Sequence, residues 1–207
     1  YTPYTLPLCG AAAVSVALAI YAWRRRSAPG LGPSIVIMLA VTVWSFSYAL
    51  ELASVDLPAK LFWSRFLYLG IVVVPAAWLA FVFEYTNRTR WLTRRNLLLL
   101  SLPSLAVLLL VWTNDSHHLI WTAVRLDTTG SFSMLVFTHG AAFWGMVAYI
   151  YASLLLGSAL LFQVLSRRPR LYRGQAVAVL LGVLAPWIAN VLYLTGNTPR
   201  PGLDLTP

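Results

Sequence analysis

The sequence is short of acidic residues and of lysine. It contains 6 Asp and Glu against 15 Lys and Arg, and Lys60 is its single lysine. Charged residues make up 10% of the 207 residues, whereas hydrophobic residues make up 59%. This composition lies far outside that of soluble domains and is typical of a membrane protein.

Cysteine and catalytic motifs are also scarce. Cys9 is the single cysteine, so no intrachain disulfide can form. The chain has no HExxH, no GxSxG and no glycine-rich phosphate loop. Lys60 lies at the junction of a loop and a helix, so these residues supply no mid-membrane amine for a retinal Schiff base. We therefore expect a chain that is not an enzyme and that holds no cofactor.

Most of the positive charge lies in three arginine clusters, at 24–26, 88–95 and 167–173. Long apolar stretches separate them, and a membrane-spanning helix needs about 20 apolar residues. The stretches predict six spans: 6–23, 31–52, 61–85, 96–112, 141–165 and 174–195. Cytoplasmic loops carry an excess of arginine, so the clusters predict a cytoplasmic position for alternate loops and an amino end outside the cell membrane. A nucleic-acid-binding surface needs its basic residues on one accessible face. Here the arginines lie between the apolar spans, so we expect no nucleic-acid partner.

The fold predicted from these features is an all-α membrane bundle that forms a single domain over residues 1–207. One connection, 113–140, is long. Two segments within it, 119–126 and 131–138, are rich in β-forming residues and flank a turn-forming cluster at 127–130. We expect an extracellular β-hairpin that lies over the helices as a lid. Pro75, Pro103 and Pro186 fall inside spans and are expected to interrupt or kink them.

Charged residues at membrane depth are costly and therefore become candidates for a functional site. Glu51 and Arg65 lie near the outer ends of the second and third spans, which makes an ion pair between them reasonable. The pair can be a simple clamp between helices, or it can line an outward-facing pocket.

Aromatic and polar residues share helix faces with this pair. Trp44, Tyr48 and Glu51 follow helical spacing on one side of the second span. The full set of predicted ligand-binding residues is Trp44, Tyr48, Glu51, Arg65, Tyr68, His118, Trp121, Asn190 and Tyr193. Aromatic walls with a few polar anchors are typical of small-molecule pockets. Tyr193, near the end of a span, also fits an aromatic girdle at the membrane interface.

His117 and His118 are adjacent, so their side chains point in different directions, and no spaced carboxylates accompany them. We therefore expect no metal site, and we expect one of the two to orient the hairpin against the bundle. Glu84 and Arg88 have the spacing of a local pair on the surface of a helix.

The order of several segments resembles the N-terminal seven-transmembrane region of bacterial and archaeal sensor histidine kinases. The resemblance runs from about residue 10 to the end of the sequence. The segments are Tyr48–Leu52, Lys60–Ile71, Pro75–Phe81, Glu84–Thr86, Thr113–Asn114, His117–Trp121, Tyr172–Arg173, Ala189–Tyr193 and Pro201–Pro207.

The resemblance implies a sensor module whose seventh helix begins just after Pro207 and leads to a cytoplasmic kinase or other output domain. Ligand binding would shift the packing of the helices. The expected partners are the lipid bilayer, an unknown small ligand and that output domain, and a homodimer is compatible with the sequence. A transporter or channel subunit, or a plain membrane anchor, remains the alternative.

Overall fold

A computed structural model describes residues 4–24, 30–129, 132–167, 182, 188–192 and 195. The helices are α1 (Thr5–Arg24), α2 (Leu31–Ala53), α3 (Leu57–Phe66), α4 (Tyr68–Ile71), α5 (Val74–Tyr85), α6 (Arg94–Trp112), α7 (Asn114–His117) and α8 (Ala141–Arg167). A short 3-10 helix, η1 (Thr89–Trp91), precedes α6, and the strands are β1 (Trp121–Asp127) and β2 (Met134–His139).

Five helical stretches are long and apolar enough to cross a membrane: Thr5–Arg24, Leu31–Ala53, Leu57–Tyr85, Arg94–Trp112 and Ala141–Val164. They match the first five predicted spans to within a few residues. Most of the predicted sixth span, 174–195, lies outside the described residues. Within it, residues 188–192 are described and are helical. Pro186 and Tyr193 are also outside the described residues.

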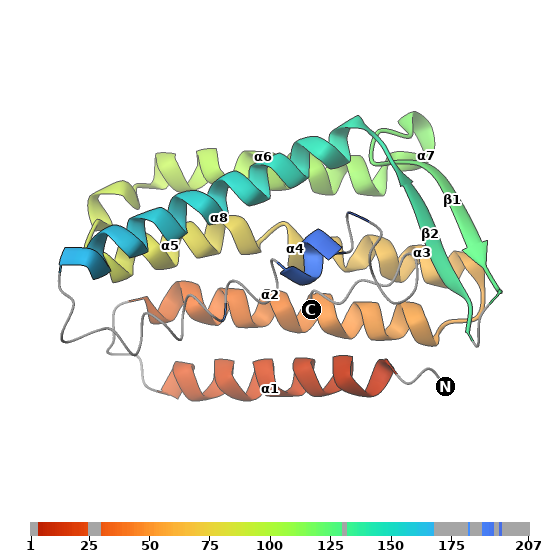
Figure 1. Ribbon diagram of the computed structural model, residues 1–207, viewed down its shortest axis with the longest axis horizontal. Coiled ribbons are helices and arrows are strands. Elements are labelled where there is room, and N and C mark those ends of the chain that lie inside the picture. Colours follow the sequence, from red (N-terminus) through yellow and green to blue (C-terminus); the bar gives the residue numbers. More distant parts are fainter. Residues whose placement is uncertain are drawn as a thin grey trace.

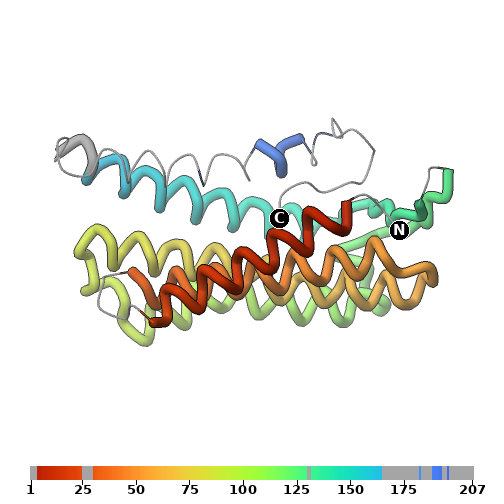
Figure 2. Tube along the Cα trace, turned by 90° about the horizontal axis from the view of Figure 1, so that it is seen from below, coloured from red at the N-terminus to blue at the C-terminus, as the bar shows by residue number. Residues whose placement is uncertain are grey.

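The helices pack side by side around α2. It contacts α1 on one side and α3, α4 and α5 on the other, while α8 contacts α5 and α6. Figure 2 shows α1 crossing α2 at the edge of the bundle. Val107 and Val111 of α6 are buried, but most of its leucines point outward, and Leu98 and Leu109 are 66% and 68% exposed. A helix of this kind would be unstable in water and is suited to lipid.

The third span is interrupted rather than continuous. It consists of α3, α4 and α5, and α5 begins one residue before Pro75. Proline has no N–H to donate, so a helix through it loses a backbone hydrogen bond. Ser104 of α6 donates to the backbone carbonyl of Val72 at the interruption (2.6 Å). The span is thus interrupted beside Pro75, as expected, and Ser104 pairs with a backbone carbonyl at the interruption. By contrast, α6 continues through Pro103 without a break.

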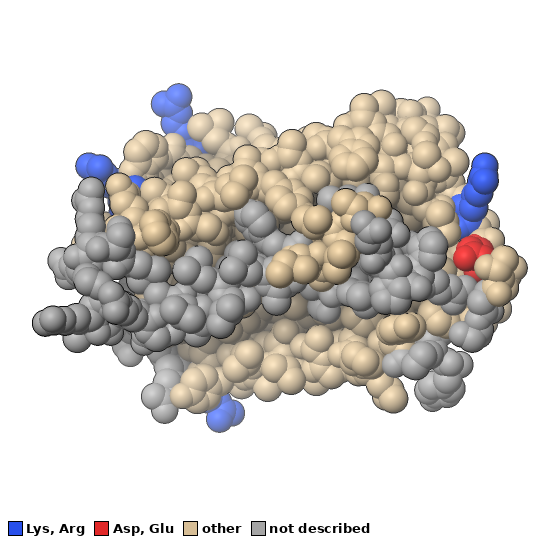
Figure 3. All heavy atoms as spheres, viewed as in Figure 1, with Lys and Arg blue, Asp and Glu red and all other residues tan. Residues whose placement is uncertain are grey.

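The two ends of the bundle differ in charge. The carboxyl ends of α1, α5 and α8 and the amino ends of α2 and α6 meet at one end, while β1 and β2 lie at the other (Figure 1). We call these the arginine end and the sheet end. In the face shown in Figure 3, charged side chains lie toward the two ends, and the described surface between them shows none.

The two strands are antiparallel neighbours, with Val124 opposite Phe137 and Asp127 opposite Met134. A bulge between Trp121 and Ala123 changes the register at the start of β1. The two strands expected between the fourth and fifth spans are therefore present and paired. The side of the membrane on which it lies remains a prediction.

Candidate functional site

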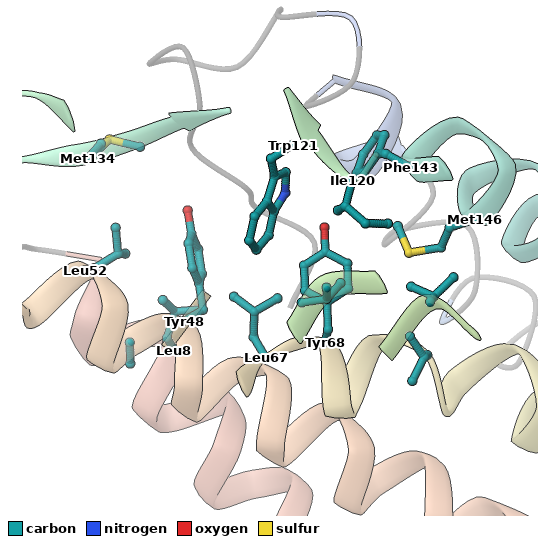
Figure 4. Close-up of a cluster of buried hydrophobic side chains, with 14 residues drawn as sticks. Leu8, Tyr48, Leu52, Leu67, Tyr68, Ile120, Trp121, Met134, Phe143 and Met146 are labelled. Atoms are coloured by element: carbon teal, nitrogen blue, oxygen red, sulfur yellow. The ribbon is translucent and has the colours of Figure 1, made fainter. Parts of the chain in front are cut away.

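Aromatic residues from three separate segments meet beneath the sheet. Tyr48 comes from α2, Tyr68 from α4 and Trp121 from the first position of β1, and all three are buried. The rings of Tyr68 and Trp121 meet edge to face with centroids 5.6 Å apart, and Trp121 stacks on Phe137 at 4.8 Å. Figure 4 shows Trp121 pointing from the strand toward the helices.

These residues belong to one apolar cluster, which we call the sheet-side core. Its buried members are Leu8, Tyr48, Ala49, Leu52, Leu67, Tyr68, Val72, Val107, Val111, Ile120, Trp121, Met134, Phe143 and Met146. Trp44 is half-buried and packs against this cluster. Four of the nine predicted ligand-binding residues, Trp44, Tyr48, Tyr68 and Trp121, are therefore brought together.

Asn114, which the site prediction did not include, fixes the sheet to the helices. Its buried side-chain oxygen accepts hydrogen bonds from the backbone N–H groups of Ile120 (3.0 Å) and Trp121 (3.1 Å). Its side-chain nitrogen donates to the carbonyl of Trp121 (3.0 Å). The sequence did contain a signal for this role, because Asn114 lies between a long apolar helix and a β-rich segment.

The two histidines beside Asn114 have different roles. His117 accepts a hydrogen bond from the backbone N–H of Leu119 at Nδ1 (3.0 Å), which helps to hold the turn that leads into β1. His118 has a left-handed backbone, with φ 54°, and its exposed ring donates from Nδ1 to the carbonyl of Asn114 (2.9 Å). His118 is thus part of the turn and lies outside the sheet-side core.

The ion pair of Arg65 differs from the predicted one. Its guanidinium group binds the carboxylate of Asp115 on α7 at 2.5 Å, not that of Glu51. Positions 60 and 64 of α3 are buried, whereas Arg65 lies well around the helix from Lys60 and reaches α7. The Arg65–Asp115 bridge therefore ties the third span to the segment before the sheet.

Glu51 instead lies near Lys60. Both side chains are buried, with Lys60 fully so and Glu51 4% exposed. The ammonium of Lys60 donates to the backbone carbonyl of Glu51 (2.8 Å) and is attracted by its carboxylate. The sequence analysis placed Lys60 at the junction of a loop and a helix. In the structure Lys60 lies in the first turn of α3, which begins at Leu57, and its side chain reaches α2. A cation here also stabilises the carboxyl end of α2 through the helix dipole.

At the arginine end, the predicted Glu84–Arg88 pair is absent. Helix α5 ends at Tyr85, and Asn87 takes a left-handed backbone with φ 57°, so Arg88 lies beyond the helix. Glu84 accepts the N–H of Gly30 (2.8 Å), and Arg88 donates to Gln163 of α8 (2.6 Å). The local spacing was correct, but the helix ends too early for the pair to form.

Asn190, within the predicted sixth span, is hydrogen-bonded to α8. Its side-chain oxygen accepts a hydrogen bond from the hydroxyl of Tyr151 on α8 (2.9 Å). This interaction agrees with the expectation that an asparagine in a span faces protein. Its placement with Trp44, Tyr48 and Glu51 on one pocket wall remains a prediction.

A comparison with known protein families finds one match. Residues 7–207 match the model of the N-terminal 7TM region of histidine kinase. The chain belongs to this family. No curated protein and no solved structure gives a significant match.

The 7TM region is a non-catalytic, membrane-embedded sensor module of histidine kinases, and the chain is accordingly a multi-pass membrane protein. In this 7TM region, the sheet end combines the buried aromatic rings of the sheet-side core with a buried Lys60–Glu51 contact and a sheet held by Asn114. The described residues contain no group of three or more His, Cys, Asp and Glu that could hold a metal ion.

Proposed function

We propose that the 7TM region receives its signal at the sheet end. A small, partly apolar ligand or a membrane-borne cue would bind among Trp44, Tyr48, Tyr68 and Trp121, with Glu51 and Lys60 as polar anchors. The observation that carries this proposal is the convergence of aromatic side chains from α2, α4 and β1 beneath one sheet. Apolar pockets with a few convergent polar groups are the usual form of small-molecule sites.

The proposal places the sheet outside the cell and the amino end of the chain on the same side of the plasma membrane. The support is electrostatic. Arg24, Arg88, Arg90, Arg94 and Arg95 all belong to segments that meet at the arginine end. Because arginine is enriched in cytoplasmic loops, this end is assigned to the cytoplasm.

The sheet acts as a lid in this proposal. It is joined to the bundle by the hydrogen bonds of Asn114 and by the Arg65–Asp115 bridge, which is partly exposed. A ligand that binds between Trp121 and the helices would favour an arrangement with the sheet moved outward. Only such a difference in affinity between two arrangements can shift their populations.

The shift would reach the cytoplasm through α5, α6 and α8. Helices α6 and α8 run from the sheet end to the arginine end, and α5 forms the half of its span that lies next to the arginine end. There Arg88, just beyond α5, donates a hydrogen bond to Gln163 of α8. The kinase or other output domain of the full-length protein would respond to this change in packing.

The test uses the full-length kinase in its host, with a reporter gene for its output and conditions that change the wild-type output. Tyr68→Ala and Trp121→Ala are expected to abolish the response while the protein remains in the membrane. Trp112→Ala is the matched control, because Trp112 lies at the end of α6 next to α7 and is exposed. A normal response from both core variants contradicts the assignment of the site.

The lid is tested separately. Asn114→Ala removes the anchor of β1 and is expected to change the output in the absence of any stimulus. Ser116→Ala, on the same short helix and exposed, should keep the wild-type basal output. Equal basal output from Asn114→Ala and the wild type, at equal abundance, argues against a moving sheet.

A further inference from the structure

The turn between α5 and α6 is an ordered, strongly basic surface. Arg90, Arg94 and Arg95 are exposed within six residues of chain, and none forms an ion pair within the part of the chain that the structure describes. The first turn of α6 contains no acidic residue. Glu84, the acidic residue nearest in sequence, already accepts the N–H of Gly30. The positive charge of this surface is therefore not neutralised by the described protein groups.

Several contacts hold the turn in one conformation. Arg88 and Asn87 donate backbone hydrogen bonds to Phe83 (2.7 Å) and Glu84 (3.1 Å), which closes the end of α5. The side chain of Thr93 accepts the N–H of Asn96 (3.2 Å) and so caps α6, and the Asn96 side chain donates to the carbonyl of Trp91 (2.9 Å). The arginines therefore project from a fixed backbone, which lowers the entropy lost on binding.

Aromatic and aliphatic groups lie directly beside the arginines. The ring of Trp91 stacks on Phe83 with centroids 6.3 Å apart, and the side chain remains 50% exposed. The next residues of α6 include Leu98 and Leu99, which are 66% and 54% exposed. The surface thus combines exposed guanidinium groups, an exposed tryptophan beside them and, one turn further along α6, exposed leucines. These are the groups that contact the headgroup, the interface and the acyl chains of a lipid.

We infer that this surface, Arg90–Leu99, binds an anionic phospholipid. The phosphate oxygens would accept hydrogen bonds from Arg90, Arg94 and Arg95, since guanidinium groups bind phosphate in bidentate geometry. Trp91 would lie at the level of the glycerol, and Leu98 and Leu99 would contact the acyl chains. A free phosphate would satisfy the arginines but would leave the apolar surface without a contact, so the lipid is favoured.

The experiment measures phosphatidylglycerol binding to the purified chain by native mass spectrometry, with phosphatidylcholine as the neutral competitor. Arg94→Gln is expected to weaken phosphatidylglycerol binding about fivefold, the usual contribution of one basic residue near an anionic membrane. The matched control is Arg125→Gln, because Arg125 is also exposed but lies at the sheet end, and the change should leave the affinity unchanged. The triple variant Arg90→Gln/Arg94→Gln/Arg95→Gln should lose the preference for phosphatidylglycerol over phosphatidylcholine.

Two results would overturn the inference. Equal weakening by Arg94→Gln and Arg125→Gln would show a general effect of net charge, and an unchanged preference in the triple variant would place the lipid elsewhere. Soluble glycerol phosphate distinguishes a lipid from a free anion. If it raises the melting temperature of the detergent-solubilised chain as much as phosphatidylglycerol does, and loses that effect in the triple variant, the surface binds the headgroup alone.

Discussion

Individual polar side chains at the sheet end connect segments that are distant in the sequence. Asn114 holds the start of β1, Lys60 holds the last turn of α2, and Arg65 holds α7. The contacts of Asn114 and Lys60 replace water that a buried polar group would otherwise need, whereas the Arg65–Asp115 bridge is partly exposed. The site therefore depends on these individual polar contacts, and changing one partner of a contact should have a measurable effect.

A first prediction concerns Lys60 and Glu51. Lys60→Met should lower the free energy of unfolding by about 1–3 kcal/mol, because it leaves the buried backbone carbonyl of Glu51 without its donor and removes the cation near the buried carboxylate. The double variant Lys60→Met/Glu51→Gln should recover part of that loss, because the buried charge is gone. Thermal or denaturant unfolding in detergent measures the coupling in a double-mutant cycle. Strict additivity of the two single changes would mean that the groups do not interact.

A second prediction concerns His139, which lies at the end of β2. Its ring stacks on Phe143 with centroids 3.7 Å apart, and burial lowers the pKa of His139 below its usual 6.5. The unfolded chain therefore binds the proton more readily, so stability is full above pH 6.5 and falls as the pH drops below that value. Melting temperatures across this range should show the decrease in the wild type. His139→Phe should remove that part of the pH dependence, and an identical pH profile in the variant would exclude His139 as its source.

Two glycines allow neighbouring helices to approach each other closely. Gly70 on α4 faces α2, and a Cβ at this position would overlap the backbone oxygen of Ala40 and the backbone nitrogen of Trp44. Gly157 on α8 likewise leaves room for the ring of Trp78 on α5. Small residues at such crossings let helix backbones approach within a membrane.

Gly70→Ala is therefore expected to destabilise the bundle by about 1–3 kcal/mol, the usual cost of forcing an extra carbon into a packed interior. Gly145→Ala is the control, because Gly145 lies in α8 with open space around a new Cβ. Melting temperature and yield of monodisperse protein in detergent measure both. Equal stability of Gly70→Ala and the wild type would contradict the close contact between α4 and α2.

The whole molecule is organised by the contrast between its two ends. Arginines gather at one end and the sheet covers the other, while exposed apolar side chains such as Leu102 and Leu105 line the length between. Because arginine-rich loops of membrane proteins remain in the cytoplasm, a molecule with this charge distribution has one favourable orientation in the membrane. The proposed path from sheet to output domain depends on this orientation.

Cysteine accessibility tests the orientation. Cys9 is the single cysteine, so Cys9→Ser gives a cysteine-free background. A cysteine at Arg94 should be labelled by a membrane-impermeant maleimide only after the cells are opened, and a cysteine at Thr129 should be labelled in intact cells. Labelling of position 94 in intact cells would reverse the topology and with it the assignment of the sheet to the outside.

Much of the architecture could be predicted from local sequence. The first five spans, the interruption at Pro75 and the strand pairing between α6 and α8 each depend on residues close together in the chain. The pairing of charges could not be predicted in the same way. Arg65 and Asp115 are 50 positions apart, and nothing in the spacing of either residue identifies the other.

The sequence by itself determined that this chain crosses a membrane and, to within a few residues, where its first five spans lie, because apolar length acts through the lipid and needs no partner. Only the tertiary structure decided that Lys60 lies against Glu51, that Asn114 binds the sheet and that Glu84 binds Gly30. A buried polar group must pair with whatever the fold brings within about 3 Å of it. The distance between two polar groups depends on how whole helices cross, and the crossing cannot be read from any single segment of the sequence.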